Sequence, residues 1–184
     1  YKEIAKILRP HLITKGGNII LFQIENEYDH LIAFSGVKRY RDNALRYHLK
    51  LLKMVRKAGI DIPTFAVEGS FLRKSEIIDA RTYYPNIPWI WLWEFDDFDK
   101  AIDASVAEQP KKPLMIMELE TGWFAQFGMP MYQIEPEVTR AILRTVIVEG
   151  ASVMNHFLFV GGTTFPYWNC RGDLDGIGTC TTYD

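Results

Sequence analysis

The chain has 184 residues, of which 48% are hydrophobic and 14% aromatic, a composition typical of a folded protein with one sizeable core. Its 21 basic and 23 acidic side chains leave a formal net charge of −2 without a block of like charges, so nucleic acid is not an expected partner. The longest apolar run, residues 87–93, contains Pro88 and is too short to span a bilayer.

The first part of the chain predicts a helix followed by a buried strand. Apolar residues recur at helical spacing over 3–12, and two glycines then precede a nearly continuous apolar run within 17–24. A run of this length is typical of a parallel strand covered on both faces. It leads directly into Glu25, Asn26 and Glu27, which a hydrophobic core would not accept unpaired.

The rest of the chain repeats this order of strand, polar tip and helix. After a polar loop, residues 37–58 have the period of an amphipathic helix, which Gly59 ends. The further expected strands are 60–67, 87–93, 113–117 and 153–160, and the further helices are 98–108 and the segment between Pro136 and Gly150.

This repeat predicts an α/β fold, specifically a (β/α)8 TIM barrel. The strand tips follow one another at roughly 33 residues, close to the ~31 residues per unit of such a barrel. A doubly wound open sheet also alternates strands and helices, but it would favour a glycine-rich phosphate turn. Neither GxGxxG nor GxxxxGK[ST] occurs in the chain.

Carboxylates follow most of the predicted strands. Hydrolysis of a glycosidic bond with retention needs a protonated acid beside the leaving oxygen and an ionised carboxylate beneath the anomeric carbon. Two carboxylates on different strands of one barrel supply this pair, but spacing alone does not choose between them. The candidates are Glu25, Glu27, Glu68, Glu94, Asp96, Asp97, Glu118 and Glu120.

Four segments of the chain resemble motifs of glycoside hydrolase family 35, the retaining β-galactosidases. GGNIILFQIENEY resembles its fourth-strand motif, and KPLMIMELETGWFAQF resembles the segment around its second glutamate. GASVMNHFLFVGGTTFPYWN and the closing CTTYD are similar to two later motifs, and all four occur in the family's order. The resemblance covers nearly the whole chain.

The resemblance implies a role for each matching residue. Glu27 would be the general acid/base and Glu118 the nucleophile, separated by about three barrel units of roughly 30 residues. Glu120 and Phe157 depart from the family, which commonly has tyrosine at both positions, and Glu68 stands in place of an aspartate. The substrate-binding residues would be Asn26, Trp123, Glu120, Phe157 and Tyr183.

The expected function is therefore a retaining glycosidase that removes terminal non-reducing β-galactosyl residues from an oligosaccharide or glycoconjugate, without a cofactor. Two alternatives remain open at this point. One is a non-catalytic carbohydrate-binding relative that keeps the pocket, and the other is a retaining glycosidase of the same type acting on a different sugar.

If residues 17–24 are the fourth strand, residues 1–184 are the C-terminal portion of a single catalytic barrel, covering about strands 4 to 8. The missing N-terminal barrel segment, or an oligomer partner, would then cover the open sheet edge. Cys170 and Cys180 are predicted either to form a disulfide, which would favour a secreted or periplasmic protein, or to stay free thiols. No metal site is expected, because the histidines are scattered and are predicted to be structural or solvated. These are His11, His30, His48 and His156.

Overall fold

The computed structural model describes part of the chain as two compact units. The described residues are 1–84, 95–120, 122, 124–126, 135–162 and 179–182. Unit 1 comprises Tyr1–Arg81 and Ala104–Pro113, and unit 2 comprises Thr82–Asp103 and Leu114–Asp184. None of the helices in the described ranges is both long and apolar enough to cross a membrane.

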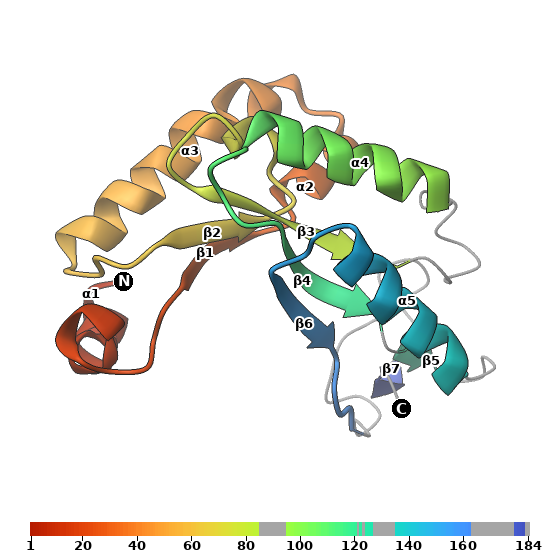
Figure 1. The fold of residues 1–184 in the computed structure, drawn as a ribbon. Coiled ribbons are helices and arrows are strands. Elements are labelled where there is room, and N and C mark those ends of the chain that lie inside the picture. The colour runs from red at the N-terminus through yellow and green to blue at the C-terminus, as the bar shows by residue number, and fades with distance from the viewer. Residues whose placement is uncertain (85–94, 121, 123, 127–134, 163–178, 183–184) are drawn as a thin grey trace. The chain divides into compact units, whose positions relative to one another are not determined.

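Unit 1 is built on three parallel strands in which β2 lies between β1 and β3 (Figure 1). Its elements, in chain order, are α1 (Lys2–Leu8), η1 (Arg9–His11), η2 (Ile13–Lys15), β1 (Phe22–Asn26), α2 (Tyr28–Ser35), α3 (Lys38–Lys57), β2 (Thr64–Val67), η3 (Ser70–Leu72) and β3 (Ile78–Tyr83).

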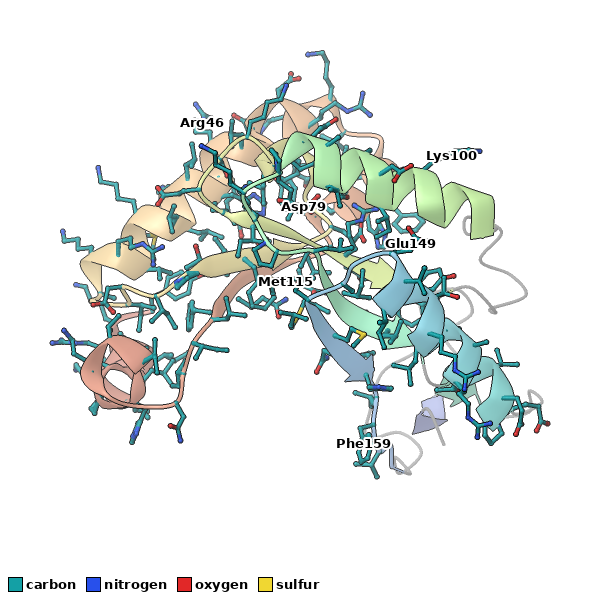
Figure 2. The ribbon with its side chains drawn as sticks, viewed as in Figure 1. Arg46, Asp79, Lys100, Met115, Glu149 and Phe159 are labelled. Carbon is teal, nitrogen blue, oxygen red and sulfur yellow. The ribbon has the colours of Figure 1, made fainter. Side chains whose placement is uncertain are left out.

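The helix α3 confirms the amphipathic pattern read from the sequence. Its buried residues recur every three or four positions and form one face, while basic residues such as Arg46 occupy the exposed face (Figure 2). Gly59 follows with a φ of 88°, a conformation that glycine adopts without steric cost. Leu52 and Val55 of α3 pack with Ile24 and Ala66 of the strands in one core cluster.

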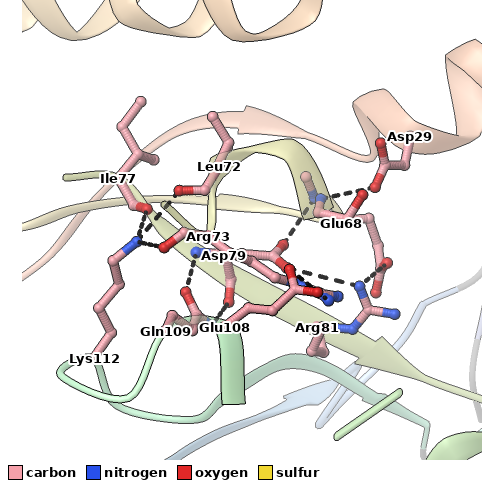
Figure 3. A network of polar contacts seen from close by, with 12 residues as sticks. Asp29, Glu68, Leu72, Arg73, Ile77, Asp79, Arg81, Glu108, Gln109 and Lys112 are labelled. Carbon is pink, nitrogen blue, oxygen red and sulfur yellow. Dashed lines mark hydrogen bonds and ion pairs between the residues drawn. The ribbon is translucent and has the colours of Figure 1, made fainter. Parts of the chain in front are cut away.

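Unit 1 also buries a charged side chain, Asp79, the second residue of β3. Asp79 is completely buried, yet its Oδ1 accepts from the Gly69 N–H at 2.9 Å and its Oδ2 accepts from Arg73 Nε at 2.8 Å (Figure 3). The Gln109 amide bonds to the backbone N–H and C=O of Asp79 at 3.2 and 2.8 Å. Burial of this carboxylate is tolerable because each oxygen has a donor.

The Lys112 side chain bonds to the backbone of the segment between η3 and β3. Its Nζ donates to the carbonyl oxygens of Leu72, Arg73 and Ile77 at 3.3, 2.9 and 2.8 Å (Figure 3). Burial lowers the pKa of the Lys112 ammonium, an effect that the negative charge of Asp79 partly opposes. One side chain thus donates hydrogen bonds to three backbone carbonyl oxygens of residues outside the strands.

Unit 2 contains the parallel pair β4 and β6 and the antiparallel pair β5 and β7 (Figure 1). Its core joins Ile116 of β4 to Ile142 and Val146 of α5, with Tyr83 and Ile102 in the same cluster. The helix α4 begins in unit 2 and ends in unit 1. The elements are α4 (Phe95–Glu108), β4 (Met115–Glu120), β5 (Phe124–Gln126), α5 (Pro136–Val148), β6 (Val153–Phe157) and β7 (Thr179–Thr182).

The fold-class prediction is confirmed: the described part contains five parallel strands, alternating with helices as in part of a (β/α)8 barrel. Several boundaries were wrong. The first helix ends at Leu8 rather than residue 12, because Pro10 has no N–H for the helix and lies in η1. The first strand is Phe22–Asn26 rather than 17–24, and α2 occupies the predicted polar loop after Glu27.

The strand β3 was not predicted, since Asp79 and Arg81 interrupt its apolar pattern. All six of its residues are nevertheless buried, because the two charged side chains are paired inside the unit. The strand expected at 87–93 lies outside the described residues. The link from β2 to β3 contains η3 and no α-helix among its residues, all of which are described.

Replacement of Asp79 by leucine should destabilise the protein strongly. The change removes the nearer and fully buried of the two carboxylates that pair with Arg73, the other being the more exposed Glu108 at 3.6 Å, and breaking such a buried pair costs about 3–5 kcal/mol. The exposed pair Lys38–Asp42, at 2.6 Å, provides the matched control, and Asp42→Ala should change the stability by less than about 0.5 kcal/mol. Thermal and urea unfolding measure both changes, and equal effects would contradict this account.

His48 should make the fold less stable in acid. Its Nδ1 bonds to the Ala44 carbonyl at 2.9 Å, while the buried Nε2 has no partner among the described residues and lies among the rings of Tyr28, Tyr47 and Phe71. Burial lowers the pKa of His48 from its ordinary 6.5. The unfolded chain therefore binds this proton more readily, and stability declines as pH falls below 6.5.

The variant His48→Phe keeps an aromatic ring at this position and removes the titrating group. We expect its unfolding free energy to change less between pH 7.5 and pH 5 than that of the unsubstituted protein. Urea unfolding across this range measures the difference, and identical pH dependences would show that His48 is not responsible.

Candidate active site

The candidate site residues divide between the two units, and the first set lies at the carboxyl end of β1. The pairing of β1 with β2 contains an extra residue, Ile24, so that the strand has a β-bulge before its polar tip. The paired positions are Phe22 with Thr64, Gln23 with Phe65, Glu25 with Ala66, and Asn26 with Val67. Beyond the bulge, each side chain changes face relative to a regular strand.

The bulge brings Gln23 and Asn26 to the same side of β1. These residues are three positions apart, and in a regular strand they would point to opposite faces. Instead, Gln23 Nε2 donates to Asn26 Oδ1 at 3.0 Å, and both side chains are exposed. The amide oxygen of Asn26 is therefore occupied, which leaves its Nδ2 group to donate to a ligand.

Glu25 is directed toward α3. Its Oε2 accepts from the Tyr47 hydroxyl and its Oε1 accepts from the Asn26 N–H at 3.0 Å. The hydrogen bond to this carboxylate raises the pKa of Tyr47 to about 12, and burial of the hydroxyl makes a smaller contribution in the same direction. Both oxygens of Glu25 thus serve local structure.

Glu27 follows β1 in a left-handed backbone conformation, with φ 52° and ψ 37°, and is the N-cap residue of α2. Its N–H donates to Val67 O at 2.7 Å, which ties this conformation to the neighbouring strand. The Glu27 side chain is 34% exposed, and its Oε1 lies 3.3 Å from His30 Nδ1. Glu27 is thus a partly exposed carboxylate on a firmly held backbone.

Glu68 occupies the equivalent position after β2, since it follows Val67, the register partner of Asn26. It has the same left-handed conformation, with φ 53°, but its side chain is buried and bonds to Arg81 Nη1 at 2.8 Å (Figure 3). The same backbone geometry therefore presents one carboxylate to solvent and places the other in an ion pair.

The turn after Glu68 also holds the beginning of α2. The Asp29 N–H donates to Glu68 O at 3.0 Å, and Asp29 Oδ2 accepts from the Ser70 N–H at 2.8 Å (Figure 3). Asp79 receives the Gly69 N–H from the opposite side. The buried network of unit 1 thus supports the backbone that carries Glu27.

In unit 2, the bulge in β4 decides the direction of Glu118. Leu114 and Ile116 belong to the core cluster with α5, and regular alternation would direct Glu118 to the same side. Between Ile116 and Leu119, however, β4 has two residues where β6 has one, and Leu119 rejoins the cluster. Glu118 is thereby directed away from that face.

The Glu118 carboxylate receives a hydrogen bond from Tyr84. The Tyr84 hydroxyl donates to Glu118 Oε2 at 2.6 Å, and the tyrosine ring is buried. Such a donor stabilises the ionised carboxylate in a partly buried setting. Asn155 Nδ2 donates to Met117 O at 3.0 Å, which holds the backbone at the bulge.

Comparison with known proteins assigns the family. The model of glycosyl hydrolases family 35 matches residues 1–184. The chain belongs to glycosyl hydrolases family 35. The beta-galactosidases of Pongo abelii and Homo sapiens are each 30% identical to it over 166 residues, which is 88% of this chain and 22% of theirs. The beta-galactosidase-1-like protein of Mus musculus is 28% identical over 189 residues, covering 100% of this chain and 27% of that protein. The chain thus spans about a quarter of the length of these relatives.

The remaining residues expected from the family 35 motifs differ in whether the structure describes them. Trp123, Tyr183 and Cys170 lie outside the described residues, whereas Cys180 is in β7. Glu120 of β4 and Phe157 of β6 are register partners. In the described ranges, no three His, Cys, Asp or Glu side chains are grouped so that they could hold a metal ion.

Tyr84 is a residue that sequence reasoning missed in this family 35 chain. The motif comparison drew attention to tyrosines lost at Glu120 and Phe157, but the hydroxyl beside Glu118 comes from the end of β3. The available signal was the tyrosine pair at positions 83 and 84, the last residue of the buried strand β3 and the residue after it. It went unnoticed because that strand was not predicted.

The contact between Tyr84 and Glu118 should be measurable as a coupling free energy. Tyr84→Phe removes the hydroxyl that donates to Oε2, and loss of a hydrogen bond to a charged group costs about 1.5–3 kcal/mol. A double-mutant cycle with Glu118→Met, followed by urea unfolding, isolates the pair. Tyr40→Phe, on the exposed face of α3, serves as the control. A coupling near zero would contradict the contact.

Proposed function

We propose that the full-length protein is a retaining glycoside hydrolase that removes terminal non-reducing β-galactosyl residues from oligosaccharides or glycoconjugates. Membership of family 35 and the similarity to proteins named beta-galactosidase support this function. The observation that carries it is the placement of two carboxylates, Glu27 just after the bulged strand β1 and Glu118 within the bulge of β4, each near the carboxyl end of a parallel strand. Barrel enzymes place their catalytic groups at these ends.

In the first step, an ionised Glu118 attacks the anomeric carbon. The bond from this carbon to the leaving oxygen breaks, and the carboxyl proton of Glu27 passes to that oxygen. The product is a glycosyl-enzyme ester at Glu118 and a free aglycone. The Tyr84 hydroxyl supports the role of Glu118, because it favours the ionised form that the attack requires.

In the second step, water replaces the aglycone. Glu27, now ionised, takes a proton from the water as the water oxygen bonds to the anomeric carbon, and the ester bond to Glu118 breaks. Two inversions at one carbon give net retention. This mechanism requires carboxyl groups ~5–5.5 Å apart, compared with ~6.5–9.5 Å in an inverting enzyme.

Asn26 would bind the sugar hydroxyl next to the anomeric carbon through its Nδ2 group. Its exposure and its contact with Gln23 support this role. Trp123 would stack on an apolar sugar face and Tyr183 would line the pocket, as the family motifs imply. Glu120 and Phe157 would shape the pocket beside Glu118, where their departure from tyrosine bears on which sugar is accepted.

Substitution of Glu118 by glutamine in the full-length protein should abolish hydrolysis of an aryl β-galactoside, with a loss of at least about 10³-fold. Glutamine has nearly the same shape but cannot form the ester with the anomeric carbon. Glu137→Gln, an exposed position on α5, serves as the matched control and should retain turnover. Unchanged turnover in Glu118→Gln would remove this residue from the nucleophile role.

A 2-deoxy-2-fluoro-galactoside distinguishes the enzyme from its alternatives. Covalent trapping on the peptide that contains Glu118 would support the retaining mechanism. Reversible binding without trapping would instead indicate a non-catalytic carbohydrate-binding relative. Turnover of another aryl glycoside in preference to the galactoside would assign the same mechanism to a different sugar.

A further inference from the structure

His30 lies beside the candidate acid/base Glu27 in the first turn of α2. Its Nδ1 is 3.3 Å from Glu27 Oε1, and its backbone N–H donates to Glu27 O at 3.0 Å. On its other side, the ring meets Phe34 edge-on, with centroids 6.0 Å apart and planes at 73°. The imidazole is thus held between the Glu27 carboxylate and an aromatic ring.

The charged groups that surround His30 are carboxylates, and two of them are bound to other groups. Asp29 bonds to the Ser70 N–H, and Glu68, which approaches from the end of β2, is paired with Arg81. From α3, Tyr47 and His48 contact the ring of Tyr28. Within the described part of the chain, His30 is the side chain that contacts the Glu27 carboxylate.

These surroundings favour a protonated His30. The hydrogen bond to Glu27 raises the pKa of His30 above 6.5, and the negative charges of Glu27, Glu68 and Asp29 add to this effect. Burial acts in the opposite direction but does not outweigh it. Close to neutral pH, the imidazole therefore carries its positive charge more often than a free histidine would.

We propose that His30 is a positioning partner of Glu27. Its Nδ1–H binds Oε1 of Glu27, which leaves Oε2 to face the glycosidic oxygen. This inference rests on the proposed function, because it takes Glu27 as the acid/base.

Glu27 alone closes the proton balance of the two steps. Its carboxyl proton passes to the leaving oxygen in the first step, and it takes a proton from water in the second. In the glycosyl-enzyme, the positive charge of protonated His30 stabilises the ionised Glu27. His30 keeps its own proton in both steps, so its role is to hold and orient the carboxylate.

Two substitutions of His30 in the full-length protein test this role. The variant His30→Leu removes the donor to Oε1, and we expect kcat/KM for an aryl β-galactoside to fall about tenfold, mainly through kcat. The variant His30→Gln keeps an N–H donor for Oε1 and should restore most of this loss. If His30→Leu kept the kcat/KM of the unsubstituted protein, or if His30→Gln were as impaired as His30→Leu, the inference would be overturned.

His11→Leu provides the matched control. His11 is an exposed histidine in η1, at a distance in sequence from the candidate residues, and its substitution should leave kcat/KM unchanged. If His11→Leu lowered kcat/KM as far as His30→Leu, the loss would not be specific to the partner of Glu27, and the inference would be wrong.

A second measurement does not depend on catalysis. In ¹³C-histidine-labelled full-length protein, the NMR signal absent from His30→Gln identifies His30, and its pKa should fall toward 6.5 when Glu27 is replaced by Gln. An identical titration in both proteins would overturn the His30 inference even if the enzyme is active. An unsubstituted protein that hydrolyses no aryl glycoside would instead overturn the proposed function, whatever the titration shows.

Discussion

The alternation of side chains along a strand is the constraint on which the candidate site depends. In a regular strand, Gln23 and Asn26 would point to opposite faces, and Glu118 would join Leu114 and Ile116 on the face that packs on α5. A single extra residue in β1, and another in β4, reverses the alternation just before the polar tip. Each strand can therefore pack its apolar part in a core and still direct its terminal polar groups elsewhere.

The carboxylates of the chain differ in their partners more than in their positions. Glu25 is engaged by Tyr47 and by a backbone N–H, and Glu68 and Asp79 are buried against arginines. Glu27 has a partly exposed carboxylate beside His30, and Glu118 has a tyrosine donor. The partners of Glu25, Glu68 and Asp79 thus belong to the fold itself, whereas the Glu27 side chain stays 34% exposed.

The backbone of unit 1 holds conformations that an isolated peptide would avoid. Glu27 and Glu68 both have positive φ values, and each such residue costs about 1–3 kcal/mol. Hydrogen bonds across the strand ends offset this cost, from Glu27 N to Val67 O and from Glu68 N to Ala80 O. The network around Asp79 fixes the adjoining turn. The buried ion pairs and hydrogen bonds of unit 1 therefore help to hold the backbone of Glu27, whose side chain is partly exposed.

The sequence alone determined the barrel class and the long helices, and its motifs singled out Glu27 and Glu118 as candidates, because apolar periodicity and contiguous motifs depend on neighbours in the chain. It did not determine β3, since the buried charges Asp79 and Arg81 find their partners only in the folded unit. Nor did it place Tyr84 beside Glu118 or His30 beside Glu27. The tertiary structure decided these contacts, because they depend on strand register and on bulges, which are properties of the pairing between strands rather than of either strand by itself.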